Sequence, residues 1–372
     1  MKKPAAFALV CLLAGGEALA QSSVGLTSSD STSVTVFGIV DVRVAYGSGD
    51  AASKLALTSG GNAPSRFGFR GLTDLGGGLA AGFWLEAGMN PDDGTGGAGN
   101  INNQPSGATP SGSFISFNRR STVSLIDRWG ELRLGRDFTA LFRNRDSTDP
   151  FGTTGLGQSM PDVATIGGPT ATRASNMIGY FLPPGLGGFF GEFQYFMGEN
   201  IRYSPATAIT PNDQGGNGYA GRIGWTNGAF GIAVAGENTK FTQTETTGEV
   251  QSVNFGTSYD FKVVRVTAGY FQDKVKSFVP VKATGYIVGA MVPFGASQFK
   301  VSYSSYGTDE VTDPRADKLA VGYVYNLSKR TAAYATVAYL RNKGTSTFAL
   351  NGSLTNPGES SRGYDLGLRH SF

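Results

Sequence analysis

The sequence predicts an all-β fold, a 16-stranded antiparallel transmembrane β-barrel, and three observations support this. First, apolar residues recur with a period of two along most of the 372-residue chain, and no long stretch repeats them with a helical period. Second, short turn-forming connections alternate with long polar connections. Third, the polar positions of these runs contain many charged residues, which a dry protein core would not accept.

The first 20 residues have the parts of a secretory signal peptide. Lys2 and Lys3 precede a short apolar stretch, and Ala18-Leu-Ala20 supplies the small-x-small cleavage pattern. The apolar stretch is too short to cross a bilayer as a helix. A lipoprotein anchored at Cys11 is the alternative, but no small residue directly precedes that cysteine. We therefore expect residues 1–20 to be removed and residues 21–372 to form a single barrel domain.

The alternating runs predict the strands one by one. In the first run Val34, Val36, Val40 and Val44 share one face, while charged residues occupy the other. The last run alternates in the same way and ends on Phe372, which is unusual for a frayed, polar terminus. The runs 121–126 and 331–341 alternate poorly. The predicted strands span residues 33–46, 64–73, 78–89, 113–126, 130–138, 173–182, 187–198, 217–227, 229–240, 249–261, 262–274, 281–293, 297–307, 316–327, 331–343 and 361–372.

The connections between these strands are of two kinds that alternate along the chain. The short ones, rich in Gly, Asn, Asp and Pro, include residues 74–78, 127–130, 183–187, 227–228, 294–296 and 326–329. The long ones, polar and Gly-rich, include residues 90–112, 139–172, 199–216 and 343–361. An even number of strands with one smooth rim and one rim of long loops is typical of a bacterial outer-membrane barrel.

The charges on the polar face separate a membrane barrel from a secreted β-sandwich. Asp41, Arg43, Arg66, Arg265 and Lys300 fall on that face, and a closed core of such charges would be very costly to desolvate. A water-filled lumen keeps them hydrated, and 16 strands enclose an aqueous channel. The apolar face then contacts lipid, and closure of the sheet pairs every backbone group.

One cysteine and one histidine limit the chemistry that the chain can perform. Cys11 lies in the expected signal peptide, and His370 lies two residues from the end of the chain. A His/Cys metal site, a disulfide framework and a Ser/His or Cys/His catalytic set are therefore excluded. We expect no enzyme activity, no cofactor and no metal. Since 31 basic residues nearly balance 28 acidic ones, a nucleic-acid partner is not expected either.

Five motifs, in this order along the chain, resemble those of the Gram-negative general porins, in particular the β-proteobacterial branch. The resemblance spans essentially the whole mature chain. It implies a homotrimeric 16-stranded channel in the bacterial outer membrane, with an inward-folded third loop that narrows the lumen. It also implies contact with outer-membrane lipid and lipopolysaccharide, and passage of small hydrophilic solutes and ions. The motifs are residues 33–41 (SVTVFGIVD), 65–79 (SRFGFRGLTDLGGGL), 117–125 (FNRRSTVSL), 130–136 (GELRLGR) and Phe372.

The resemblance further implies a ladder of arginines on the channel wall. It transfers to Arg66, Arg119 and Arg173. The period of two independently places Arg66 and Arg70 on one face of their strand. The alternative for each arginine is a solvated charge at the rim. Three more basic residues, Arg43, Arg70 and Arg133, are expected near the constriction of the pore.

Acidic groups on the third loop are expected to face this ladder. The long connection 139–172 follows directly after residues 130–136 and contains Asp149-Pro-Phe-Gly152. This segment is similar to the Pro-Glu-Phe-Gly turn of the family, with the acidic residue and the proline exchanged. We expect Asp146 and Asp149 to be the acidic residues of the constriction, offset by Arg143 and Arg145 on the same loop.

These charges predict a general diffusion channel for small hydrophilic solutes and ions, with a weak to moderate preference for anions, because rings of Arg and Lys select anions. Two alternatives remain at this stage. A substrate-specific sugar channel would need eighteen strands and a run of aromatic residues on the inner face. A surface adhesin barrel would suit the long loops.

The position of Arg136 in its strand predicts where the subunits contact one another. It falls on the apolar face of its strand with Leu132 and Leu134, and an arginine that faces hydrocarbon costs ~2–4 kcal/mol near the bilayer midplane. We expect a homotrimer that forms its contact around the first five strands. There the second loop of a neighbour would bring backbone carbonyls, Asp92 or Asp93 to Arg136. The alternative is that Arg136 lies at the rim and reaches the water there.

Overall fold

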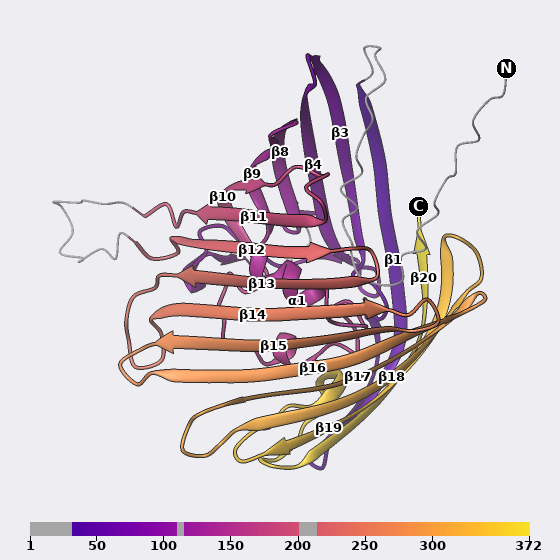
Figure 1. The fold of residues 1–372 in the computed structure, drawn as a ribbon. Helices are drawn as coiled ribbons and strands as arrows, with labels where there is room; N and C mark the ends of the chain where they lie inside the picture. The colour runs from indigo at the N-terminus through magenta and orange to yellow at the C-terminus, as the bar shows by residue number, and fades with distance from the viewer. Residues whose placement is uncertain (1–31, 110–114, 201–213) are drawn as a thin grey trace.

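In the computed structural model, which describes residues 32–109, 115–200 and 214–372, nearly all regular structure belongs to one large antiparallel sheet (Figure 1). The expected signal peptide lies outside the described residues. The strands of the sheet are β1 (Ser33–Ser48), β2 (Ser53–Ser59), β3 (Arg66–Gly76), β4 (Leu79–Asn90), β5 (Thr95–Gly96), β8 (Arg120–Asp127), β9 (Gly130–Phe138), β10 (Arg173–Phe181), β11 (Phe189–Phe196), β12 (Gly218–Thr226), β13 (Phe230–Thr239), β14 (Glu249–Asp260), β15 (Arg265–Lys276), β16 (Val281–Phe294), β17 (Ser297–Thr308), β18 (Arg315–Asn326), β19 (Thr331–Lys343) and β20 (Ser360–Ser371).

Sixteen of these strands close into a barrel, as the sequence predicts. Each strand pairs with the next along the chain, and β20 closes the ring by pairing with β1 over the register Ile39↔Ser371 to Ser48↔Arg362. The two remaining strands of the sheet lie at the long-loop rim, where β2 pairs with the second half of β1 and β5 pairs with the end of β4. Neither β2 nor β5 was expected from the sequence.

The last residue of the chain takes part in this closure. Phe372 and Gly38 exchange two backbone hydrogen bonds of 3.1 Å each. The aromatic ring of Phe372 lies where a side chain at position 38 would stand. Gly38 therefore makes room for the terminal ring, which gives the unusual apolar terminus a structural role in sealing the barrel.

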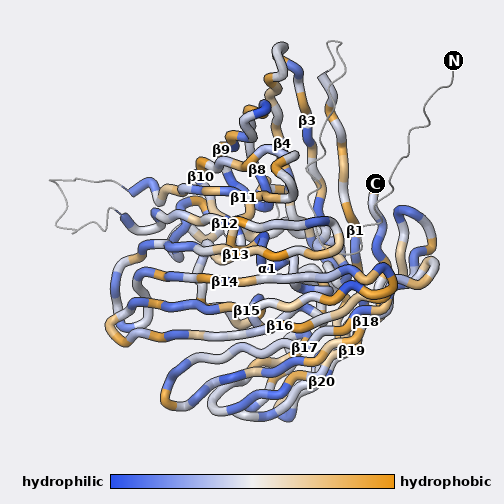
Figure 2. Tube along the Cα trace, in the orientation of Figure 1, coloured by the Kyte–Doolittle hydropathy of each residue, from blue (hydrophilic) through white to orange (hydrophobic). Residues whose placement is uncertain are grey.

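The two faces of the barrel differ in polarity as the period of two predicts. The exposed large hydrophobic residues, such as Val36, Val123, Phe193 and Leu366, share the outer face, whereas Asp41 is among the buried polar residues of the inner face. Figure 2 shows the alternation as hydrophobic and hydrophilic colours that succeed one another along the strands. An apolar exterior around a polar interior is the arrangement of an outer-membrane barrel.

Tyrosines divide the outer face into two parts. The sequence has no tyrosine between residues 47 and 179, so β3, β4, β8 and β9 carry none; we call these four strands the Tyr-free wall. From β10 to β20 every strand except β13 carries at least one exposed tyrosine, and we call this part the Tyr-bearing wall. Tyrosine rings gather where a barrel meets the lipid headgroups.

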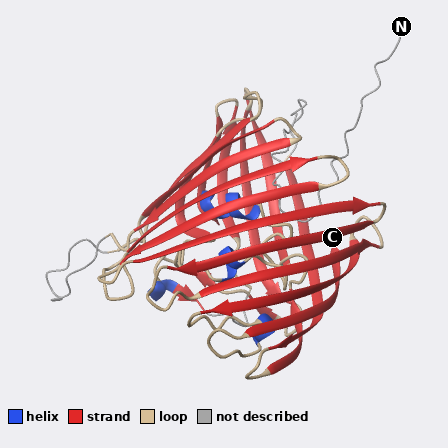
Figure 3. Cartoon of the chain, turned by 60° about the horizontal axis from the view of Figure 1, so that its bottom comes forward, coloured by secondary structure: helices blue, strands red, loops and turns tan. Residues whose placement is uncertain are grey.

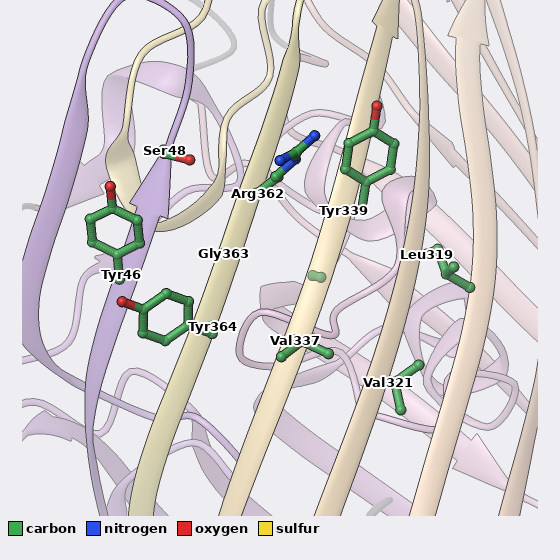
Figure 4. Close-up of a pocket in the computed structure, with 10 residues that line it drawn as sticks. Tyr46, Ser48, Leu319, Val321, Val337, Tyr339, Arg362, Gly363 and Tyr364 are labelled. Carbon is green, nitrogen blue, oxygen red and sulfur yellow. The ribbon is translucent and has the colours of Figure 1, made fainter.

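A shallow groove lies at the long-loop end of the Tyr-bearing wall. It has a volume of about 500 Å³ and is lined by β1, β18, β19 and β20. Figure 4 shows Tyr46 beside Tyr364, with Tyr339 and Arg362 further along. The rings of Tyr46 and Tyr364 stack with their centroids 5.2 Å apart, and the Arg362 guanidinium lies 5.8 Å from the Tyr339 ring.

The long connection between β9 and β10 lies inside the barrel (Figure 3). Thr139 caps its first helix, α1 (Ala140–Asp146), by accepting a hydrogen bond from the Phe142 backbone N–H. The segment then crosses the inner wall: a Cβ at Gly256 would lie 2.6 Å from Thr148, and a Cβ at Gly322 would lie 2.7 Å from Phe151. Glycines on the wall thus leave the space that the loop occupies.

The same loop returns along the inner wall to β10. Its tip reaches the β1 side of the ring, where the Thr154 hydroxyl donates to the Gly60 carbonyl oxygen at 3.0 Å. On the way back α2 (Met160–Val163) begins with the Met160 N–H donating to the Ser304 hydroxyl at 2.9 Å, and Thr165 donates to Asp273 on β15 at 3.0 Å. No helix in the described part of the chain is long and apolar enough to cross a bilayer.

Candidate pore constriction

The two helices of the loop pack against β11–β14 and β16–β18. The opposite inner face, on β20, β1, β3, β4, β8, β9 and the start of β10, meets the loop at Arg143 and near Thr154, and we call it the uncovered wall. This face carries the predicted arginines. Cross-strand pairs place Arg66 opposite Ile39 of β1, on the inner face with Asp41. Since residues two apart share a face of a strand, Arg66 and Arg70 both point into the lumen, and the alternating phenylalanines Phe67 and Phe69 point outward.

Arg66 and Arg119 meet at a buried carboxylate that was not predicted from the sequence, and Arg173 lies beside Arg119. The Nε of Arg119 lies 2.5 Å from Oε1 of Glu86 on β4, and the Nε of Arg66 lies 3.9 Å from the same oxygen. Arg173 donates from its Nε to the backbone carbonyl of Arg119 at 3.0 Å. The three predicted arginines therefore form one cluster, which we call the Glu86 cluster.

Phe138, at the end of β9, lies beneath two guanidiniums of this cluster and that of Arg143 from the loop. The guanidinium carbons lie 4.1 Å from its ring centroid for Arg173, 5.9 Å for Arg119 and 5.8 Å for Arg143. An aromatic face attracts a cation and restricts the motion of a long side chain. The arginines are thus held close together by a shared ring rather than dispersed by mutual repulsion.

Arg43 lies further around the same wall and is paired. Its Nη1 donates to Asp365 on β20 at 2.5 Å. The neighbouring carboxylate of Asp41 accepts the backbone N–H groups of Gly61, Asn62 and Ala63 at 2.8 to 3.0 Å, together with the hydroxyl of Tyr334. These bonds fold residues 60–65 against the wall and occupy the negative charge of Asp41.

Arg369 is a further basic residue of this wall that the sequence analysis did not select. It is the cross-strand partner of Asp41 and alternates with the exposed Leu366 and Leu368. Its Nε has no hydrogen-bond partner in the described structure. The period of two along β20 was the signal that placed this guanidinium in the lumen.

Asp137 is the centre of a second cluster, which contains the predicted Arg133. Asp137 is fully buried, and its Oδ2 accepts from Arg133 at 2.6 Å and from Arg143 of α1 at 2.7 Å, with Arg120 at 3.6 Å. Arg133 also makes a bidentate pair with Glu131, with both bonds at 2.8 Å. Because Arg143 belongs to the loop, this cluster fastens the inward loop to the wall.

Arg70 lies apart from both clusters. Its guanidinium stacks over the rings of Phe37 and Trp84. It is exposed to the lumen, and none of the carboxylates in the described residues lies within 4.0 Å of it. Phe37 and Trp84 are thus aromatic residues on the inner face of the barrel.

The two predicted loop carboxylates have structural partners. Asp146 accepts a hydrogen bond from Thr153 at 3.0 Å. Asp149 is 4% exposed and accepts the backbone N–H groups of Phe151 and Ser159, each at 2.8 Å. Burial raises the pKa of Asp149, the nearby Asp162 raises it further, and the two N–H bonds act in the opposite direction. Asp149 therefore holds the turn of the loop instead of lining the aperture, contrary to the expectation for that residue.

Two buried lysines on the inner face of the Tyr-bearing wall lie next to the loop. Lys300 of β17 donates to the Asn62 side chain at 3.3 Å and lies 5.7 Å from the Phe151 ring centroid. Lys318 of β18 is equally buried, beneath the part of the loop that contains Asp149. These positive charges offset the negative charges of Asp149 and Asp162. The loop carboxylates therefore neutralise little of the positive charge on the opposite wall.

Away from the turns, the uncovered wall has more guanidiniums than carboxylates. The electrostatic potential of the lumen is therefore positive on this side, and an electric field crosses the aperture from this wall toward the loop. The basic side chains are Arg43, Arg66, Arg70, Arg119, Arg120, Arg133, Arg173 and Arg369, and the acidic ones are Asp41, Glu86, Glu131, Asp137 and Asp365.

Arg136 points outward, as expected, but it does not face hydrocarbon. Its guanidinium donates to the backbone carbonyls of Asn118 at 2.6 Å and Asn100 at 3.0 Å, and to the hydroxyl of Ser175 at 2.8 Å. Carbonyls of the second loop were expected as its partners, but they come from the same chain and not from a neighbour. Hydrogen bonds within the subunit thus offset the free-energy cost of an arginine that points away from the lumen.

A closed 16-stranded barrel with a polar lumen, an apolar exterior and a loop folded into the bore defines a water-filled membrane channel. Comparison with known proteins agrees. The model of the Gram-negative porin family matches residues 5–345, and the chain belongs to this family. The chain is therefore an integral protein of the bacterial outer membrane and a channel rather than an enzyme.

The relatives cover most or all of the chain. Outer membrane porin protein 32 of Delftia acidovorans is 35% identical over 384 residues and covers 100% of both chains. An outer membrane porin protein of Bordetella pertussis is 29% identical, over 89% of this chain and 92% of its own. A solved structure described as an anion-selective porin from Comamonas acidovorans superimposes with a TM-score of 0.79 at 34% identity, over 92% of this chain and 100% of its own.

Proposed function

We propose that the channel admits small hydrophilic solutes and ions by general diffusion and prefers anions over cations to a weak or moderate degree. The excess of guanidiniums over carboxylates on the uncovered wall carries this proposal. Arg66, Arg119 and Arg173 form its centre, and Arg369, Arg43, Arg70 and Arg133 extend the positive surface along the bore. A similar structure is described as anion-selective, which is consistent with this assignment.

The sign of the preference follows from the partners of each charge. Asp41 and Asp365 are occupied by backbone N–H groups and by Arg43, and Asp137 is occupied by Arg133 and Arg143. Glu86 alone faces both Arg66 and Arg119. A passing anion therefore meets a surface with more guanidinium than carboxylate charge, whereas a passing cation meets carboxylates that are already bound.

Single-channel recording in a salt gradient tests the proposal. In a KCl gradient the reversal potential of the wild-type channel should lie toward the chloride equilibrium value. The double variant Arg66→Gln with Arg173→Gln should move it toward the potassium value. Arg362→Gln is the matched control, because it removes the same charge from the outer face, and it should leave the potential unchanged. A wild-type channel without chloride preference, or a double variant without a shift, would contradict the proposal.

We also propose a homotrimer that forms its contact through the Tyr-free wall. Tyrosine is absent from β3, β4, β8 and β9 but present on almost every strand of the Tyr-bearing wall, and a surface covered by another subunit has no need of an interfacial aromatic belt. Arg136, held under the second loop, lies on this wall. The Tyr-bearing wall then contacts outer-membrane lipid, with lipopolysaccharide at the long-loop rim.

A further inference from the structure

Two rows of side chains cross the inner face near the short-turn side of the Glu86 cluster. The cross-strand pairs place Thr35, Arg70, Trp84 and Thr122 in one row. The adjacent row contains Phe37, Gly68, Glu86 and Arg120. Arg70 follows Arg66 by four residues, so it lies about 13 Å further along β3, toward the short turns.

Gly68 creates the space in which an aromatic pair forms. A Cβ at Gly68 would lie 2.7 Å from Cζ of Phe37, so the Phe37 ring lies over the glycine and reaches Trp84, with centroids 5.0 Å apart and planes inclined at 59°. The indole N–H of Trp84 donates to Oε2 of Glu86 at 3.1 Å. Both rings are therefore fixed in position on the lumen wall.

Two guanidiniums flank this aromatic pair. Arg120 lies 4.5 Å from the Trp84 ring centroid, is buried, and has Asp137 and Thr122 as partners. Arg70 lies 5.1 Å from the Trp84 ring and 5.7 Å from the Phe37 ring. Arg70 is exposed to the lumen, and no carboxylate of the described residues lies within 4.0 Å of it. The N–H groups in the plane of its guanidinium can therefore bind a carboxylate in bidentate fashion.

We propose that Arg70, Trp84 and Phe37 form a binding site for carboxylates that carry an aromatic body, of which benzoate is the simplest. The carboxylate pairs with the edge of the Arg70 guanidinium, and the ring of the solute packs against Trp84 and Phe37. An anion without a ring gains only the charge contact, whereas an aromatic carboxylate gains both. The inference rests on the proposed function, because the solute reaches the site through the open channel.

The site adds a preference to a general channel and does not close it. Bound benzoate occupies part of the bore beside the loop, so it should reduce the chloride current while it stays. Acetate has the same charge and carboxylate but lacks the ring, and cyclohexanecarboxylate has a ring of similar size without an aromatic face. These three anions separate the contributions of charge, apolar surface and aromatic contact.

The experiment measures single-channel conductance of the mature oligomer in KCl while sodium benzoate, acetate or cyclohexanecarboxylate is titrated from the short-turn side. In the wild type, benzoate should reduce the current at a concentration about three- to ten-fold lower than acetate, the size expected of one aromatic contact, with cyclohexanecarboxylate between them. Trp84→Leu and, independently, Phe37→Leu should bring the benzoate value close to that of acetate. Arg70→Gln should weaken the effect of all three. Phe193→Leu, which removes an exposed ring from the outer face, is the matched control and should change nothing.

The outcomes separate this site from the function of the channel. Equal effects of benzoate and acetate on a wild-type channel that still prefers chloride would overturn the site and leave the proposed function intact. An unchanged benzoate preference in both Trp84→Leu and Phe37→Leu would do the same. A wild-type channel that shows no chloride preference would overturn the proposed function instead. If Trp84→Leu does not assemble, Phe37→Leu decides alone, because it leaves the Trp84 bond to Glu86 in place.

Discussion

The Tyr-free wall and the Tyr-bearing wall differ on both of their faces, and the two differences coincide. On the outside, one wall lacks the aromatic belt that the other carries. On the inside, the Tyr-free wall carries most of the arginines of the lumen, of which Arg70 is the most exposed, whereas the helices of loop 139–172 pack against the Tyr-bearing wall from β11 to β18. Thr148, Phe151 and Met160 of that loop pack against the covered side.

This coincidence shows how an apparently uniform barrel acquires one functional side. The loop occupies the half of the lumen that the Tyr-bearing wall encloses and leaves the other half for solutes. The strands behind that other half carry the charges, and we propose that neighbouring subunits support them from outside. A wall that holds many like charges close together gains from a rigid backing, because its geometry decides the field in the aperture.

The largest effect is expected at Asp137, which joins the loop to the charged wall. In Asp137→Asn, Arg133 and Arg143 lose a shared buried carboxylate, and removal of one partner of a buried ion pair costs about 3–5 kcal/mol. The barrel should therefore lose its folded form at a lower temperature, as measured by its altered migration on a gel after stepwise heating. Glu245→Gln, an exposed residue of a long loop, is the control. Equal unfolding temperatures of wild type and Asp137→Asn would show that other contacts hold the loop to the charged wall.

Phe151 tests whether the loop is held by packing against the covered wall. Its ring is 5% exposed and fits between Gly157 of the loop and Gly322 of β18. Phe151→Ala should weaken this attachment by about 3 kcal/mol, the lower end of the range for a buried phenylalanine. Single-channel conductance should rise and become noisier, because the loop no longer holds one position. Phe193→Ala on the outer face should leave the conductance unchanged, and a quiet channel of normal size in Phe151→Ala would contradict this role.

Arg136 tests the proposed contact on the Tyr-free wall. Arg136→Ala removes three hydrogen bonds that hold the second loop to β9 and β10, and we expect a loss of about 1–3 kcal/mol. The oligomer should dissociate into monomers at a lower temperature on a detergent gel, with Arg362→Ala on the Tyr-bearing wall as control. If only Arg362→Ala lowered the dissociation temperature, the subunit contact would lie on the Tyr-bearing wall instead. If the wild type formed no oligomer, the proposed homotrimer would be wrong.

The smallest effect is expected at Glu86. Glu86→Gln removes the carboxylate that faces Arg66 and Arg119, so the anion preference should increase, opposite in sign to the double arginine variant. The two guanidiniums already neutralise much of this buried charge, so we expect a shift smaller than that of the double arginine variant. The reversal potential in a KCl gradient measures it, with Glu245→Gln as control. A shift toward potassium would mean that Glu86 does not face the path of the ions.

The sequence predicted the strands and their faces well, because both depend on local alternation. Fifteen of the 16 barrel strands lie within three residues of their predicted bounds, and Arg66, Arg70 and Arg136 have the predicted orientation. The exception is the strand predicted at residues 113–126, because β8 begins only at Arg120. The additional strand β2 was missed because residues 60–65 interrupt the run and fold onto Asp41. That interruption arises from backbone N–H groups that meet a carboxylate about 20 residues away, which no local pattern records.

The site itself was predicted in part. Arg66, Arg119 and Arg173 come together, but their common partner Glu86 was not selected, although its place on the inner face of β4 follows from the same alternation. Asp149 was assigned to the aperture because it is acidic and on the right loop. It is instead buried near Lys300 and Lys318, which belong to strands some 150 residues further along the chain.

By itself, the sequence determined the barrel, the number of its strands and the sign of the charge on its inner face. Those properties follow from the period of two and from the cost of burying ions, which act on each strand separately. The tertiary structure alone decided which carboxylate meets which guanidinium, where the loop lies and which wall it leaves open. These depend on cross-strand register and on contacts between distant segments, where a shift of one residue would exchange the two faces.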